Sequence, residues 1–198
     1  MRKFKNYTIC YRESYEQAEW SAYCLSDFQL EKNTDRTNDF RVDPLISTGS
    51  AALADYRKSS FDRGHLTPAA DMSFDETAMS ETFYMSNMTP QNPQFNRGIW
   101  KDLEAQVRIW VKQFGKAYVV SGPVLNKKAT SYTTIGNNNV TIPEYFYKVI
   151  LVPVSGQTHV KIFCFKSLNY YLKNAQNGKI PLGWNYAFKR KSGRNRRF

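Results

Sequence analysis

The sequence predicts an α+β domain in which strands form the scaffold and one long helix packs against them. Short runs rich in aromatic and β-branched residues occur near the start of the chain and again in its last third. One segment between them keeps its apolar residues at helical spacing. No internal repeat and no linker-like stretch divides the 198 residues. A chain of this length can bury one core, so we expect a single domain over residues 1–198.

Two strands are predicted at the start of the chain, at residues 7–11 and 20–25, with the polar residues 12–19 connecting them. Residues 27–43 are polar and charged and follow neither the helical nor the strand period. This stretch is therefore a predicted loop, and loops carry functional residues more often than the elements they connect. One helical turn is expected after it, at residues 51–54.

A third strand is predicted at residues 81–86, followed by a loop at 87–95, because Pro90 and Pro93 oppose regular structure there. Residues 96–114 form the clearest helix in the sequence. Asn96 stands at its expected N-cap, and Gly115 ends it. Its apolar residues keep to one face: Ile99, Trp100, Leu103, Val107, Trp110, Val111 and Phe114.

Three more strands are predicted at residues 117–121, 145–154 and 159–166, the last two joined as a hairpin through residues 155–158. Residues 127–140 form a polar excursion between the first two of these strands. A second helix is expected at 167–174. The chain ends in a basic tail, residues 189–198, in which six of ten side chains are basic.

The charge of the chain favours a polyanionic partner. The sequence has 28 Lys and Arg against 17 Asp and Glu, which gives a net charge of +11 and a pI of about 9.6. Nucleic acid fits this charge because neutralised phosphates release counterions; an anionic membrane surface or a merely solubilising surface would fit it too. The chain shows no run of 18 apolar residues and no signal peptide, so we expect no membrane insertion.

The three cysteines, Cys10, Cys24 and Cys164, have no spacing typical of a zinc site. Cys10 and Cys24 could pair across neighbouring strands, but each lies in an apolar run where a buried thiol is also expected. The cysteine pattern therefore fits both an oxidising and a reducing compartment.

The residues with the clearest chemistry lie between positions 61 and 108. His65 can act as a general base, because an imidazole titrates near neutral pH. In an extended run, alternation places Arg63 on the same face as His65, where both could face one phosphate. Gly64 between them permits a close backbone approach. The alternative for Asp62 and Arg63 is a surface ion pair in a turn.

The predicted helix adds a second group of candidates. The amide oxygen of Asn96 is a hard ligand that suits Mg²⁺, an ion that keeps most of its waters. Glu104 and Arg108 are i, i+4 partners that border the apolar stripe. They either form an ordinary surface ion pair or line a cleft between helix and sheet.

Three motifs resemble the DNA/RNA non-specific endonuclease family, the ββα-metal nucleases that include endonuclease G. These motifs are Asp62-Arg63-Gly64-His65 with Pro68, the segment Ser86-Asn87-Met88-Thr89-Pro90-Gln91, and Asn96-Arg97-Gly98-Ile99-Trp100 leading to Glu104 and Arg108. The resemblance implies a central, mostly antiparallel sheet with helices on both sides and a strand-strand-helix metal finger that holds the site.

The resemblance also implies roles. His65 would be the general base, and Asn96 would be the only direct protein ligand of Mg²⁺, which Mn²⁺ could replace; Glu104 would contact the metal through water. Arg63 and Arg108 would position or stabilise the phosphate, and Asp62 would orient the site. The family's upstream arginine corresponds to Arg36 or to its rival Arg41, of which Arg36 is preferred.

The function expected by resemblance is Mg²⁺-dependent cleavage of DNA and RNA without sugar preference, leaving 5′-phosphate and 3′-hydroxyl ends. A homodimer and a protein inhibitor are further expected partners, and a secreted or periplasmic location is favoured. Two alternatives remain: a nucleic-acid-binding module without catalysis, and a phosphodiesterase for small nucleotides, which would not require a charge of +11. His159, the other histidine, is interpreted as structural.

Overall fold

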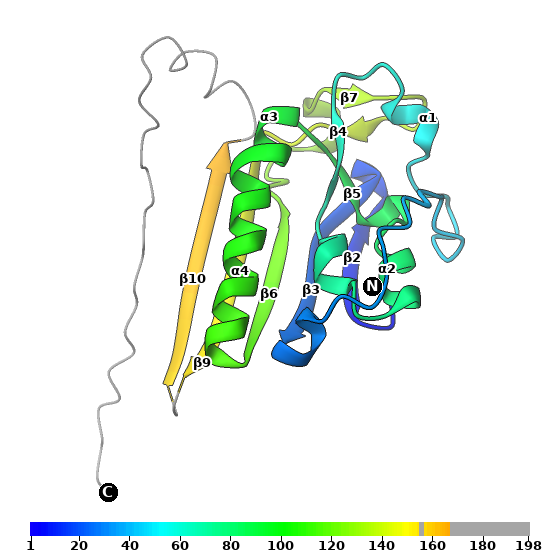
Figure 1. Cartoon of the computed structure of the whole chain (residues 1–198). Coiled ribbons are helices and arrows are strands. Elements are labelled where there is room, and N and C mark those ends of the chain that lie inside the picture. The colour runs from blue at the N-terminus through cyan, green and yellow to red at the C-terminus, as the bar shows by residue number, and fades with distance from the viewer. Residues whose placement is uncertain (155–156, 167–198) are drawn as a thin grey trace, which may run out of the picture.

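A six-stranded antiparallel sheet forms the centre of the protein (Figure 1). The structure is a computed structural model that describes residues 1–154 and 157–166 of the chain. The strands predicted at 7–11, 20–25, 117–121, 145–154 and 159–166 are all confirmed. In spatial order the sheet contains β1 (Arg2–Lys3), β2 (Tyr7–Arg12), β3 (Gln17–Ser26), β6 (Lys116–Pro123), β9 (Tyr145–Val154) and β10 (Gln157–Lys166).

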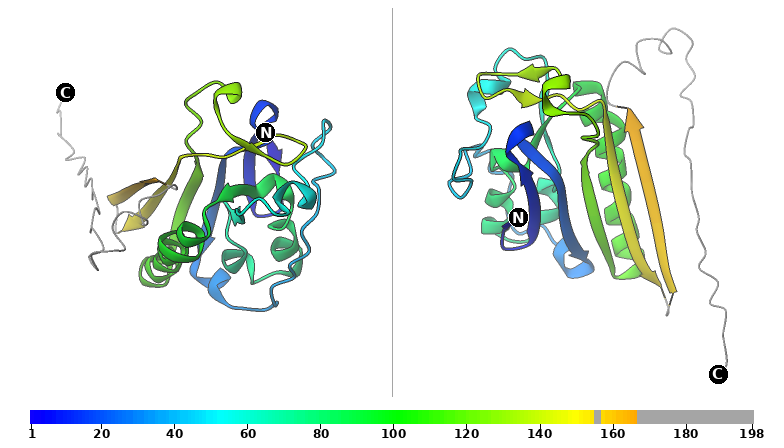
Figure 2. Two further views of the ribbon diagram at one scale, coloured as in Figure 1. Left: turned by 90° about the horizontal axis from the view of Figure 1, so that it is seen from above. Right: turned by 180° about the vertical axis from the view of Figure 1, so that it is seen from behind.

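The two longer helices of the described chain, α2 (Glu76–Glu81) and α4 (Lys101–Phe114), pack on the same face of this sheet and not on both sides, as the resemblance implied (Figure 2). Their apolar residues meet alternate residues of the strands, because successive strand side chains point to opposite faces. In α4 the buried positions are Leu103, Val107 and Val111, and Trp110 packs against them, which confirms most of the predicted stripe. Phe114 is exposed at the end of the helix, so its assignment to the stripe is wrong. The main core also contains Phe4, Tyr7, Ile9, Ala18, Tyr23, Leu25, Leu66, Met72, Ala78, Ala117, Val119, Ile150 and Val152.

The central helix begins earlier than predicted. The helix α3 (Pro93–Phe95) starts after Asn92, whose side-chain oxygen accepts a hydrogen bond from the backbone N–H of Gln94. Pro93 fits the first turn because no intrahelical bond needs its missing N–H. The expectation that Asn96 is the N-cap is therefore wrong: Asn96 opens a wide π-helical turn, Asn96–Trp100, that leads into α4. Gly115, with a φ of 85°, ends α4 as predicted.

A two-stranded ribbon leads into this helix. The strand β4 (Asp62–His65) pairs antiparallel with β5 (Met88–Gln91), and α3 follows directly, which gives the strand-strand-helix order of the implied finger. The strand predicted at 81–86 is wrong, because residues 85–87 form a 3₁₀ turn after the end of α2. The expected loop at 87–95 is also wrong. Pro90 is accommodated in β5 because both strands of a ribbon are edge strands, where a missing N–H is tolerated.

The polar excursion at 127–140 contains a small hairpin of β7 (Thr134–Ile135) and β8 (Val140–Thr141), which packs on α1 (Leu53–Tyr56). In the hairpin turn, the amide nitrogen of Asn138 donates to Asp55 of α1 at 2.8 Å. Residue 136 is glycine with a φ of 67°, and a Cβ there would lie 2.2 Å from the Asp55 carboxylate. The hairpin and α1 lie beside each other near β4 (Figure 1). The predicted helical turn at 51–54 is thus present, two residues later.

Some predictions lie outside the described residues. These are the helix at 167–174, the basic tail 189–198, the side chain of Cys164 and the two turn residues of the β9–β10 hairpin. In the described ranges, none of the helices has the length and apolar character needed to cross a membrane. The remaining short elements are 3₁₀ turns at Glu13–Tyr15, Asp27–Leu30, Ala69–Met72, Met85–Asn87 and Ala129–Ser131.

Cys10 of β2 and Cys24 of β3 are both free thiols, so they do not pair with each other. In the β2–β3 register Cys10 lies opposite Trp20. Both thiols are half-buried rather than fully buried.

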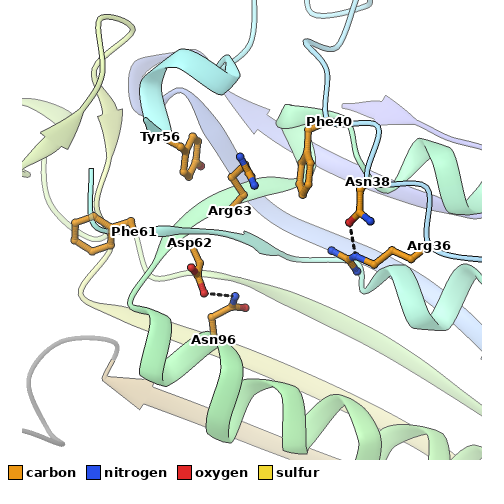
Figure 3. A pocket seen from close by; sticks show the side chains of 8 residues that line it. All are labelled: Arg36, Asn38, Phe40, Tyr56, Phe61, Asp62, Arg63 and Asn96. Carbon is orange, nitrogen blue, oxygen red and sulfur yellow. Dashed lines mark hydrogen bonds between the residues drawn. The ribbon is translucent and has the colours of Figure 1, made fainter. Parts of the chain in front are cut away.

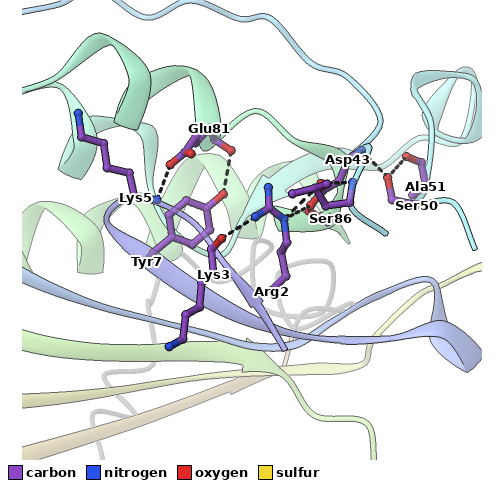
Figure 4. A network of polar contacts seen from close by, with 10 residues as sticks. Arg2, Lys3, Lys5, Tyr7, Asp43, Ser50, Ala51, Glu81 and Ser86 are labelled. Atoms are coloured by element: carbon purple, nitrogen blue, oxygen red, sulfur yellow. Dashed lines mark hydrogen bonds and ion pairs between the residues drawn. The ribbon is translucent and has the colours of Figure 1, made fainter. Parts of the chain in front are cut away.

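A buried carboxylate, Asp43, ties the N-terminus to the loop that precedes α1 (Figure 4). Its Oδ2 accepts a hydrogen bond from Ser86 at 2.7 Å and pairs with Nε of Arg2 at 3.3 Å. Its Oδ1 accepts from the backbone N–H of Leu45, and its own N–H donates to Ser50. The predicted loop at 27–43 is therefore anchored at its end to β1 and to the turn before β5.

Replacing this carboxylate should destabilise the protein strongly. Asp43→Ala leaves Arg2 without its counter-charge and Ser86 without its acceptor, so we expect the free energy of unfolding to fall by about 3 kcal/mol. Urea denaturation would measure the fall. The matched control is Asp35→Ala, because Asp35 forms an exposed ion pair with Lys32 and its loss should leave stability unchanged. Equal stabilities of the two variants would contradict the prediction.

Candidate active site

A cavity of about 280 Å³ opens between β4, the first turns of the central helix and the loop at 27–43 (Figure 3). It gathers four of the predicted site residues, namely Asp62, Arg63, Asn96 and Arg36. Aromatic rings form much of its remaining wall. The cavity is lined by Arg36, Asn38, Phe40, Tyr56, Phe61, Asp62, Arg63 and Asn96.

On one side of the cavity, the carboxylate of Asp62 holds Asn96 in place. The amide Nδ2 of Asn96 donates to Asp62 at 2.9 Å, and Arg97 binds both oxygens of Asp62, at 2.6 and 2.8 Å. Burial raises the pKa of Asp62, but the hydrogen bonds from Arg97 and Asn96 outweigh it and hold that pKa below its ordinary value. With its nitrogen engaged, Asn96 has an amide oxygen that makes no hydrogen bond to any described residue.

On the other side lie two arginines. Arg63 stacks on the ring of Phe40 at 4.2 Å, and Arg36 lies 4.7 Å from the ring of Phe83. Nε of Arg36 donates to Asn38 at 2.8 Å. The aromatic contacts hold both guanidinium groups beside the cavity while leaving donors available for an anion.

Arg41, the rival of Arg36, lies elsewhere. Its guanidinium donates to the carboxylate of Asp39 and to Ser80, and it stacks on Tyr84 at 3.9 Å. Of the two candidate upstream arginines, only Arg36 lines the cavity.

His65 follows the cavity along β4 and is 91% buried, with only 9% of its surface exposed. Its ring contacts the edges of Phe40 and Phe83, at centroid distances of 5.9 and 5.1 Å. Because Arg63 and His65 both touch Phe40, they share one face of β4, as predicted. Nε2 of His65 is buried and has no hydrogen-bond partner in the described part of the chain.

Burial and the charges of Arg36 and Arg63 lower the pKa of His65 from its ordinary 6.5 to about 3. The imidazole is therefore neutral near pH 7, the state in which it can accept a proton.

The free energy of unfolding should decrease as the pH is lowered, because of this histidine. Below about pH 6.5 the histidine binds a proton in the unfolded chain, whereas in the folded protein His65 stays neutral down to about pH 3. Between these values the free energy of unfolding therefore falls by up to about 1.4 kcal/mol for each pH unit. Between pH 7 and 5 the wild type should lose about 2 kcal/mol more than His65→Gln in urea unfolding. His159→Gln serves as the control and should retain the wild-type loss. Identical pH dependence in His65→Gln would contradict the prediction.

Glu104 and Arg108 do not line the cavity. Arg108 forms an ion pair at 2.7 Å with Asp71, which is fully buried and also accepts from the hydroxyl of Tyr23. The alternative of an ordinary Glu104–Arg108 pair is thus not realised. Glu104 is half-buried, and burial raises its pKa to about 7, against the opposing charge of Lys148.

Several contacts fix β4 against the sheet. The indole N–H of Trp100 donates to the carbonyl of His65 at 3.3 Å, and Ser121 of β6 donates to the carbonyl of Leu66 at 2.7 Å. Gly64 is required by packing, because a Cβ there would lie 2.1 Å from the side chain of the buried Gln91. These contacts hold the histidine backbone rigidly beside the helix.

Sequence reasoning missed Arg97, Asp71 and Lys148. Arg97 adjoins Asn96 in the sequence, but nothing local indicates that it reaches Asp62. Asp71 carries no motif signal. Lys148 had a sequence signal: it lies on the same face of its strand as the buried Phe146 and Ile150, where a charged residue is unexpected.

The cavity thus joins a hard amide oxygen, two fixed cations and a neighbouring neutral imidazole. These are the groups that phosphoryl transfer requires: charge stabilisation, a metal ligand and a base.

Comparison with known proteins agrees with this chemistry. The model of the family described as DNA/RNA non-specific endonuclease matches residues 1–183. The chain is 38% identical over 159 residues to the mitochondrial nuclease EXOG of Danio rerio, covering 76% of this chain and 46% of that protein. It is 34% identical over 165 residues to the mitochondrial endonuclease G of Homo sapiens, covering 79% of this chain and 56% of that protein. The chain therefore spans about half the length of these curated relatives.

The fold is also similar to a solved one. A chain in the crystal structure of the EndoG/EndoGI complex aligns with a TM-score of 0.78 and 33% identity, over 84% of this chain and 74% of that chain. This similarity confirms the predicted fold class.

One expectation is wrong in the light of these relatives. A secreted or periplasmic location was favoured from the sequence, whereas the similar proteins from Danio rerio, Homo sapiens and Schizosaccharomyces pombe are mitochondrial nucleases.

Proposed function

We propose, from the premise that this chain belongs to the DNA/RNA non-specific endonuclease family, that it is a metal-dependent endonuclease acting on both DNA and RNA. One observation carries the proposal: a single cavity is lined by the amide of Asn96 and by the guanidinium groups of Arg36 and Arg63. Guanidinium groups recognise phosphate without reading bases, so little sequence preference is expected.

The residues present fit a magnesium ion. The Nδ2 of Asn96 is committed to Asp62, so its Oδ1 is the atom that would bind the ion, and Mg²⁺ needs few protein ligands because it keeps most of its waters. When bound, such an ion would supply positive charge to the phosphate and increase the acidity of nearby water. Glu104 would accept hydrogen bonds from waters of hydration. Mn²⁺, a similar hard cation, would substitute.

His65 would act as the general base. Its unpartnered Nε2 would accept the proton of the attacking water while the water oxygen bonds to phosphorus. The bond from phosphorus to the 3′ oxygen would break, and that oxygen would take a proton from solvent water. The products would be a 5′-phosphate and a 3′-hydroxyl. Arg63 and Arg36 would stabilise the charge that grows on the phosphate oxygens, and Asp62 would orient Asn96 through their hydrogen bond.

A protein inhibitor is a further proposed partner. The solved structure that this chain resembles concerns the inhibition of EndoG in its complex with EndoGI. An acidic protein surface that covers the cavity would find the same cations that bind phosphate.

The test is to incubate the protein with supercoiled plasmid and with RNA, in Mg²⁺, in Mn²⁺ and in EDTA. Cleavage of both substrates with either ion, and none with EDTA, is expected. End-labelling with and without phosphatase would show whether the 5′ ends carry phosphate. Intact plasmid and RNA in both metals would contradict the proposal, and salt-dependent binding without cleavage would favour a binding module instead.

The two upstream arginines provide a matched pair of variants. Arg36→Ala should lower kcat/KM for plasmid cleavage by at least about tenfold, because one charge-assisted hydrogen bond contributes about 1.5–3 kcal/mol. Arg41→Ala should lower thermal stability but leave kcat/KM near the wild-type value, since its guanidinium is engaged with Asp39. The opposite ranking of the two variants would show that the assignment of Arg36 is wrong.

A further inference from the structure

The most unusual buried group outside the cavity is the ammonium of Lys148. Its side chain is 0% exposed, and Nζ has no hydrogen-bond partner among the described residues. It lies on the core face of β9, between Phe146 and Ile150, both also fully buried. A buried charge without a partner is strongly unfavourable, so its presence in the core requires an explanation.

Two groups of the central helix face this ammonium. Nζ lies 4.3 Å from the ring of Trp100, the residue whose indole N–H binds the carbonyl of His65. Glu104 follows one helical turn after Trp100, and side chains at i and i+4 lie on one face of a helix. Nζ above the indole therefore lies on the side of the helix that carries Glu104, although the two groups form no direct ion pair in the described part of the chain. Burial lowers the pKa of Lys148, and the negative charge of Glu104 is the largest influence that opposes this, ahead of that of Asp71.

Two arginines also act on Glu104. Arg108 is already paired with Asp71 at 2.7 Å, and Arg36 lines the cavity, where its free donors are assigned to phosphate. Lys148 retains all three of its donors, and Glu104 makes no hydrogen bond to any described residue. A half-buried carboxylate and a buried ammonium thus lack partners at the same end of the helix, and each provides the charge that the other needs.

We infer that Lys148 is a positioning residue for the proposed nuclease site, acting as the counter-charge that keeps the Glu104 carboxylate facing the hydrated ion while its stem packs on Trp100. The inference rests on the proposed function, because it concerns the residue proposed to bind waters of hydration. A purely structural lysine would instead support the core without any dependence on Glu104.

A double-mutant cycle separates these roles. We would measure Mn²⁺ affinity by calorimetry and unfolding free energy by urea without metal, for the wild type, Lys148→Met, Glu104→Gln and the double variant. Lys148→Met should weaken Mn²⁺ binding about tenfold, as loss of a partner around a metal site does. The double variant should bind Mn²⁺ no more weakly than Glu104→Gln, and it should be more stable than Lys148→Met, because it removes the unpaired carboxylate. Lys112→Met on the exposed side of α4, which loses the same charge, should match the wild type.

Independent, additive losses of Mn²⁺ affinity would overturn the inference. So would unchanged or tighter Mn²⁺ binding by Lys148→Met, the result expected if the lysine only repels the ion. If Lys148→Met fails to fold, the double variant should still fold. If the double variant also fails to fold, the lysine has a structural role only. A wild type that binds no divalent ion would contradict the proposed function itself, whereas a wild type that binds Mn²⁺ with no coupling in the cycle contradicts only the role of Lys148.

Discussion

His65→Ala is expected to lower the rate of plasmid cleavage by on the order of 10²-fold or more, the usual loss when a general base is removed. The structure gives the physical reason: Nε2 is unpartnered, and burial together with two neighbouring arginines keeps the imidazole neutral, so that this nitrogen is free to accept a proton. The rate would be measured by gel assay under single-turnover conditions, so that product release does not mask the chemical step.

The chain supplies the control for this experiment, because it has one other histidine. His159→Ala should cleave at the wild-type rate, since His159 lies in β10 and not in β4. A melting curve for each variant would show that the protein is folded at the assay temperature. Added imidazole should restore part of the rate of His65→Ala, which a merely structural loss would not allow. Full activity of His65→Ala would show that the proposed mechanism is wrong.

Asn96→Ala is expected to weaken Mg²⁺ and Mn²⁺ binding by at least about 10–100-fold, the loss typical of even indirect partners of a metal site. Its Oδ1 is the proposed direct ligand, and the other amide oxygen that lines the cavity, that of Asn38, already accepts a hydrogen bond from Arg36. Calorimetry with Mn²⁺ measures the loss directly, and the metal concentration needed for half-maximal cleavage should rise in parallel.

Asn92→Ala is the matched control, because Asn92 caps the same helix and its side-chain oxygen binds the N–H of Gln94. Loss of this cap should reduce stability by about 1 kcal/mol without changing metal affinity. Equal metal affinity in Asn96→Ala and the wild type would contradict the assignment of Asn96, whereas a loss in both variants would point to the helix terminus rather than to the ligand.

The site depends on a clamp that joins its two halves. Asp62 on β4 binds both Asn96 and Arg97 of the helix, so side-chain hydrogen bonds connect the strand that carries the proposed base to the helix that carries the proposed metal ligand. Trp100 provides a second link, to the carbonyl of His65. Rigid support of this kind keeps reactive groups at fixed separations, which is what catalysis by positioning requires.

The sequence by itself determined most of the scaffold. Strands such as β9 and the apolar stripe of α4 follow from residue periodicity, because burial of one face imposes a period of 2 or of about 3.6 residues. It was less reliable where short signals competed. Asn92 and Asn96 are both typical N-cap residues, and only the proline that follows Asn92 favours the earlier start. Residues 87–91 were predicted to be a loop because Pro90 signals a break in a long strand but is tolerated in a two-stranded ribbon. Residues 81–86 were predicted to be a strand because the pattern of a short apolar run does not distinguish a strand from a buried turn.

The sequence also determined which residues are candidates for chemistry, since Asp62, Arg63, His65 and Asn96 stand in short motifs. Only the tertiary structure decided which of them share a cavity. It placed Arg36 at the cavity and Arg41 away from it, and it paired Arg108 with Asp71 across 37 positions of the chain. Local patterns determine which face of an element is buried, but the partner of a side chain depends on how distant elements pack.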